Sequence, residues 1–87
     1  MSTKEKVLMA IYREYEKGNR DMRRTVRHDE LKLEAAAFNR DIQLLQYEGL
    51  IRGAVLVRDR NKTDPDQVIL NQVAVTNYGL HYLRSLL

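Results

Sequence analysis

Arg40 and Gln43, with Asn39 beside them, are the residues of this chain best suited to contact a base pair. An arginine can donate two hydrogen bonds to a guanine, and an asparagine or a glutamine can form a bidentate pair with an adenine. Ala36, one helical turn before Arg40, is small enough to contact a thymine methyl group, and Tyr47 follows one turn after Gln43. These residues are therefore candidates for direct contact with DNA. A solvated helix face of the same composition needs no ligand and is the alternative.

The segment that carries these residues, 31–53, has the apolar spacing of an amphipathic helix followed by a strand. Its apolar positions recur every three or four residues and form one face: Leu31, Ala35, Phe38, Ile42 and Leu45. The pattern predicts a helix over about residues 34–48, ended by Gly49, because glycine can adopt the positive φ of a helix C-terminus. Glu34 near the helix start and Asp41 on its side count modestly against a DNA-binding surface.

A basic segment, residues 17–27, precedes this helix. It holds five basic residues against Asp21 as its one acidic residue: Lys17, Arg20, Arg23, Arg24 and Arg27. We expect Arg23, Arg24 and Arg27 to contact phosphates, because a clustered basic patch is the electrostatic signature of nucleic-acid binding. A solvated basic loop explains the cluster equally well, and the mild net charge of +3 does not decide between the two.

Caps and spacing predict the other N-terminal elements. Ser2 and Glu5 have the spacing of a capping box, so a helix is expected to start at residue 3 or 4 and to end at Gly18. Residues 24–27 are expected to form a short strand that pairs with a later hairpin. A short helical turn through Leu31 follows, where a helix-turn-helix domain normally has a longer second helix.

Residues 50–58 and 67–75 are rich in aliphatic and β-branched side chains and predict the two strands of a hairpin. The connection between them, residues 59–66, is called the hairpin loop below, and Pro65 favours a turn in it. The cations in and beside this loop are candidates for contacts with phosphates or a minor groove: Arg58, Arg60 and Lys62. The loop also holds acidic residues that oppose them, which favours an uncommitted polar loop: Asp59, Asp64 and Asp66.

Thr76 is expected to cap a last helix in which Leu80, Leu83 and Leu87 form one apolar stripe. Within it, Gly79 is expected to permit close approach to a neighbouring element. Because the chain ends in bare leucines, this helix is a candidate contact between two subunits of a homodimer.

Two short motifs carry a family resemblance. The sequence EGLI at 48–51, followed by a hairpin and then by VTxxGxxYL at 75–83, resembles the second half of winged-helix proteins of the MarR and PadR kind. The length and the short second helix resemble still more the YjcQ-like proteins, which are winged-helix proteins of bacteria and their phages. The resemblance implies a winged-helix core, with DNA binding or partner binding as its role. The departure from the regulator families lies at residues 26–31, where a full positioning helix is not evident.

Several kinds of chemistry are excluded by composition and spacing. The chain has no cysteine, its only serines lie near its ends, and its four glycines are isolated, so neither a thiol nucleophile nor a phosphate-binding loop is present. The consecutive residues 28–30 cannot share a helix face as metal ligands, and the loop that opens at Asp59 lacks the glycine and glutamate of a calcium site. We therefore expect no enzyme activity, metal or cofactor.

The sequence thus predicts a single domain, residues 1–87, with an α+β, mainly helical fold: a winged helix-turn-helix with a C-terminal helix after the hairpin. No apolar run approaches the roughly 20 residues of a membrane span, so a cytoplasmic protein is expected. The predicted function is binding of duplex DNA, as a transcriptional regulator of bacterial or phage origin. The alternative is a winged-helix module, such as a phage accessory protein, that binds another protein and not DNA.

Overall fold

The computed structural model describes residues 2–59, 61 and 63–86 of the chain. Helix α1 spans Thr3–Glu16. Its capping box is confirmed, because the Ser2 hydroxyl accepts from the Glu5 N–H at 3.2 Å and the Glu5 carboxylate accepts from the Ser2 N–H at 3.0 Å. The Ser2 N–H, and then the Ser2 hydroxyl, lower the pKa of Glu5. The helix ends before Gly18, which adopts a φ of 85°.

Helix α2 spans Ala35–Tyr47, within one residue of the predicted bounds at each end. Its buried residues are Phe38, Asp41, Ile42 and Leu45, and Gly49 follows it with a φ of 78°. Helices α1 and α2 pack against each other around the aliphatic side chains that α1 buries: Val7, Leu8 and Ile11. The 3.6-residue period therefore predicted this helix correctly, since a long periodic segment with a glycine stop has few alternatives.

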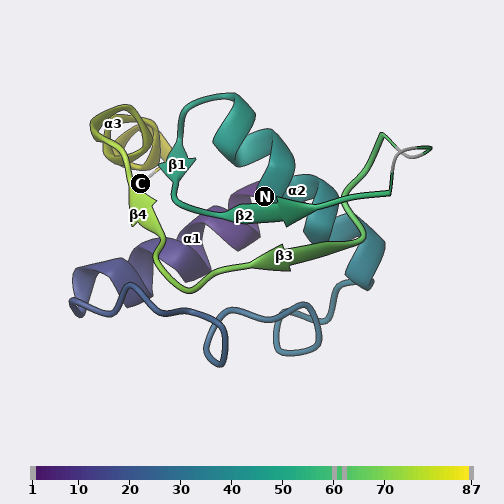
Figure 1. Cartoon of the computed structure of the whole chain (residues 1–87). Coiled ribbons are helices and arrows are strands. Elements are labelled where there is room, and N and C mark those ends of the chain that lie inside the picture. The colour runs from purple at the N-terminus through teal and green to yellow at the C-terminus, as the bar shows by residue number, and fades with distance from the viewer. Residues whose placement is uncertain (1, 60, 62, 87) are drawn as a thin grey trace.

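The predicted hairpin forms, but it is interrupted (Figure 1). Strand β1 (Ile51–Arg52) pairs antiparallel with β4 (Ala74–Val75), and β2 (Val55–Val57) pairs antiparallel with β3 (Gln67–Ile69). At the break, the Gln46 carboxamide of α2 binds the Ala54 N–H at 2.8 Å and the Ala54 carbonyl at 2.9 Å. Gly53 has a φ of 89° there, and a Cβ on it would lie 2.0 Å from the Gln72 carbonyl oxygen. A side chain of α2 thus takes the place of a strand partner.

The predicted strand at 24–27 is wrong. Residues 23–25 form a turn, and the Val26 N–H donates to the Met22 carbonyl at 3.0 Å. The strand-like pairing lies earlier, where the Met22 N–H donates to the Leu70 carbonyl at 2.7 Å and the Val73 N–H donates to the Arg20 carbonyl at 2.9 Å. Met22 and Val26 are both buried, so the turn places two apolar side chains four residues apart in one core.

The second helix is indeed reduced to hydrogen-bonded turns, as the sequence indicated. The Leu31 N–H donates to the Arg27 carbonyl at 3.2 Å and the Leu33 N–H donates to the His28 carbonyl at 2.8 Å. Between them, Lys32 has a φ of 58°, in the left-handed region that stops a right-handed helix.

Helix α3 spans Asn77–Leu86 and begins at its predicted cap. The Thr76 hydroxyl accepts from the Gly79 N–H at 2.9 Å and donates to the Gly49 carbonyl at 2.5 Å. A Cβ on Gly79 would lie 2.1 Å from the Leu50 carbonyl oxygen, so the predicted close approach is confirmed. The two motifs of the sequence, 48–51 and 75–83, therefore meet in space at this crossing.

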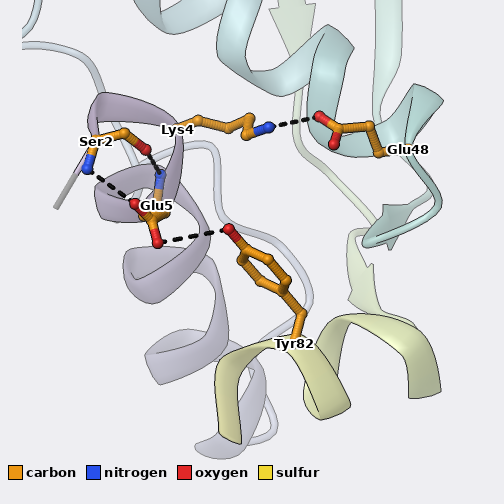
Figure 2. A network of polar contacts seen from close by, with 5 residues as sticks. All are labelled: Ser2, Lys4, Glu5, Glu48 and Tyr82. Atoms are coloured by element: carbon orange, nitrogen blue, oxygen red, sulfur yellow. Dashed lines mark hydrogen bonds and ion pairs between the residues drawn. The ribbon is translucent and has the colours of Figure 1, made fainter. Parts of the chain in front are cut away.

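Polar contacts link the start of α1 to the end of α2 and to the middle of α3 (Figure 2). Lys4 of α1 forms an ion pair of 2.7 Å with Glu48 at the end of α2, and the hydrogen bond to Glu48 raises the pKa of Lys4. The Tyr82 hydroxyl of α3 lies 3.5 Å from the Glu5 carboxylate.

The architecture is α+β and mainly helical, with a helix after the hairpin, as predicted. Within the described part of the chain, no helix is long and apolar enough to span a membrane.

Candidate nucleic-acid interface

Most of the outer stripe of α2 is exposed to solvent. Ala36 and Arg40 are exposed, Gln43 is half-buried, and Tyr47 is 87% exposed. The opposite face of the same helix is buried in the core through Phe38, Ile42 and Leu45. The core therefore fixes the rotation of α2 about its axis and leaves the candidate base-contacting residues outside.

The hairpin loop packs along the flank of this stripe, which the sequence did not predict. The Asn39 Nδ2 group donates to the Asp66 carbonyl at 3.1 Å, and the Gln43 Nε2 group donates to the Thr63 carbonyl at 3.4 Å. Between these two hydrogen bonds, an Arg40 guanidinium nitrogen lies 3.4 Å from Asp64 Oδ2. Three of the five candidate residues of α2 thus contact one short stretch of the loop, 63–66.

The hairpin loop has internal contacts of its own. The Asp66 carboxylate accepts from the Asp59 N–H at 3.1 Å, and the Asp66 N–H donates to the Val57 carbonyl at 2.8 Å. Arg58 is exposed beside this closure, whereas the predicted contacts Arg60 and Lys62 lie outside the described residues. Asp64 and Asp66, which the sequence indicated only as opposing charges, therefore have structural partners.

The three arginines of the basic segment that are candidates for phosphate contacts, Arg23, Arg24 and Arg27, are all exposed, but their surroundings differ. Arg23 binds Asp21 through two nitrogens, at 2.9 and 2.7 Å, and this lowers the pKa of Asp21 to about 2 while raising the pKa of Arg23. Arg27 pairs with Asp29 at 3.0 Å. Arg24 forms no ion pair with any residue that the structure describes. Of these three arginines, Arg24 therefore carries the charge that is most available to a phosphate.

A groove of about 450 Å³ connects the basic segment to α2. Arg23 and Arg27 line one side of it, and Asn39 of α2 and Gln67 of β3 line another. Phosphate-contacting and base-contacting candidates that are distant in sequence are therefore neighbours in the fold. Arg24 is not among the residues that line this groove and instead lines a smaller hollow with Asn19, Asp21 and Thr25.

The order of α1, a reduced second helix, α2, a hairpin and α3, with the exposed face of α2 beside the hairpin, defines a winged-helix protein. The class agrees with the fold predicted from the sequence. The chain belongs to the YjcQ family, because the family model described as YjcQ protein matches residues 6–85. Searches of curated proteins and of solved structures gave no match to this chain.

Proposed function

We propose that this chain is a non-catalytic, cytoplasmic winged-helix protein that binds duplex DNA and regulates transcription in a bacterium or a phage. One observation carries the proposal: the face of α2 opposite its buried residues carries Arg40 and Tyr47, which are exposed, and Gln43, which is half-buried. In a winged-helix protein this is the helix that enters a major groove. In this proposal, the helix that enters the major groove therefore carries side chains with the hydrogen-bond donors and acceptors needed to contact base edges.

The basic segment supplies the contacts to phosphates in this proposal. Arg24 is unpaired among the described residues, and Arg23 and Arg27 are bound to acids in ion pairs that are about half exposed. Exposed ion pairs are typically worth only about 0–1 kcal/mol, so a DNA phosphate can compete for either arginine. Arg58 adds a cation beside the hairpin loop.

The double variant Arg40→Ala/Gln43→Ala tests which face contacts the bases. We expect its affinity for a duplex selected by the wild-type protein to fall about tenfold or more, because each good bidentate contact discriminates by about 1–3 kcal/mol. Its affinity for random-sequence duplex should change much less. Fluorescence anisotropy with both duplexes measures the two effects.

The matched control is Arg13→Ala/Gln72→Ala, which removes the same residue types from exposed positions away from α2. It should leave both affinities close to those of the wild type. A folded Arg40→Ala/Gln43→Ala variant that keeps full affinity for the selected duplex would contradict the assignment of this face.

A protein-binding module is the second candidate, and the exposed apolar side chains favour it. Leu44 and Tyr47 of α2 and Val55 and Val57 of β2 are all exposed. If the protein has no affinity for DNA, these side chains are where a protein partner would be sought.

A homodimer through α3 stays a prediction. The large apolar side chains that α3 exposes, and that such a contact could bury, include Tyr78 and Leu86.

A further inference from the structure

We infer that the hairpin loop holds the base-contacting side chains of α2 in position, and that Asp64 is the positioning residue for Arg40. The inference rests on the proposed DNA-binding function and assigns the loop a role in it. The loop would act through α2, and so would not need contacts of its own with DNA. From the sequence, the acids of this loop were expected only to oppose the nearby cations.

The two carboxamides remain competent to bind a base while they are held. Each carboxamide has two N–H donors and one carbonyl acceptor. Asn39 and Gln43 each donate one N–H to a loop carbonyl, of Asp66 and of Thr63 respectively. Among the described residues, the second N–H and the carbonyl oxygen of each side chain form no other hydrogen bond, and a bidentate contact with adenine needs one donor and one acceptor. The hydrogen bonds to the loop thus orient the two carboxamides and still leave them a donor and an acceptor for a base.

Arg40 is held in a comparable way. Its guanidinium has five donors, and the one ion pair that it forms among the described residues is with Asp64 Oδ2, at 3.4 Å. The Arg40 side chain is still 55% exposed, so donors remain for the O6 and N7 atoms of a guanine. A free arginine loses much rotamer entropy on binding, and an arginine that is already oriented by a carboxylate loses less.

The described end of the loop, residues 63–66, can serve as a support because it is held in place by contacts of its own. Asp66 closes it through its carboxylate and its N–H, and the Pro65 ring restricts the backbone between the two contacting residues. Pro65 is buried, so this part of the loop is seated in the protein and does not project into solvent. A loop anchored at Val57 and seated in this way can resist displacement by an incoming DNA strand.

The negative charge of Asp64 is expected to weaken the binding of DNA of any sequence, whereas its contact with Arg40 strengthens the binding of the preferred sequence. A carboxylate beside the interface repels every phosphate, whatever the base sequence. Asp64→Asn is therefore expected to keep or raise the affinity for random-sequence duplex while lowering the affinity for the preferred sequence. The ratio of the two affinities is the quantity that a positioning role changes and a simple charge effect does not.

The experiment compares the wild type, Asp64→Asn and Asp59→Asn on two probes, a random-sequence duplex and the duplex that the wild type selects from a random pool. Asp59→Asn removes the same charge from the same loop, but Asp59 has no contact with Arg40 among the described residues. We expect the ratio of selected to random affinity to fall about tenfold in Asp64→Asn and to stay within about twofold in Asp59→Asn.

Two results would overturn the inference while leaving the proposed function intact. In one, the ratio is unchanged in Asp64→Asn. In the other, the ratio falls equally in Asp59→Asn, which would show that the effect does not depend on the contact between Asp64 and Arg40. A wild-type protein that binds neither probe at low salt would instead remove the proposed function, and the positioning role with it. Circular dichroism of each variant confirms that the comparison is between folded proteins.

Discussion

Gly79→Ala is expected to lower the free energy of unfolding by about 3 kcal/mol, the combined size of an overpacked core site and a lost helix cap. The added Cβ would lie 2.1 Å from the Leu50 carbonyl oxygen and 2.9 Å from a methyl group of Val75. The Leu50 carbonyl cannot simply move away, because it accepts from the Thr76 N–H at 3.1 Å, and the Thr76 hydroxyl oxygen lies only 3.2 Å from it. Separating α3 from this carbonyl therefore breaks the cap as well.

Gly18→Ala is the matched control for this effect. Gly18 has a φ of 85°, but within the described chain no atom other than those of Gly18 and its two chain neighbours lies within 4 Å of the position that a Cβ would take. Gly18→Ala should therefore lower the free energy of unfolding by about 1 kcal/mol, the cost of placing an alanine at a positive φ. Urea denaturation of both variants measures the difference, and equal losses would show that the crossing of α3 over residue 50 is looser than the structure indicates.

The basic segment is expected to dominate the affinity for DNA of any sequence. Replacing Arg23, Arg24 and Arg27 together by glutamine should flatten the slope of log affinity against log salt by about 3, since each lost phosphate contact contributes about 1. At moderate salt the affinity should fall on the order of 100-fold. Arg24→Gln alone should flatten this slope by about 1, the contribution of one phosphate contact. Arg24 has no acidic partner within the described chain that it would have to leave.

A charge-matched control separates this local effect from net charge. The triple variant Lys6→Gln/Arg13→Gln/Arg84→Gln removes three exposed cations from α1 and α3 and leaves the basic segment unchanged. Its salt slope should stay near that of the wild type. If the two triple variants lose affinity equally, DNA would be responding to the overall charge of the protein and not to a defined interface.

Elements with a local signal were predicted from the sequence with little error. The bounds of α2 follow from a sustained apolar period and a glycine stop, and the starts of α1 and α3 follow from Ser2 and Thr76 as caps. Each of these signals lies within a few residues of the element that it defines. The close approach at Gly79 was predicted for a similar reason, since a glycine inside a helix costs stability and so indicates a site without room for a side chain.

The errors have non-local causes. The strand expected at 24–27 pairs instead around Arg20 and Met22, because the partner backbone at Leu70 and Val73 lies about 50 residues away and burial of Met22 sets the register. The contacts between α2 and the hairpin loop span 20 to 27 residues, and two of their three acceptors are backbone carbonyls. A carbonyl is the same at every position, so no residue type could indicate these two contacts in advance.

The most direct test of the central claim is the binding of the wild-type protein to random-sequence duplex DNA, measured by fluorescence anisotropy between about 50 and 200 mM salt. A DNA-binding protein whose basic segment contributes three phosphate contacts should bind with micromolar affinity at low salt and show a log–log slope of about −3 or steeper. Absence of binding at the lowest salt, or a slope near zero, would contradict the DNA-binding function and direct the search to a protein partner.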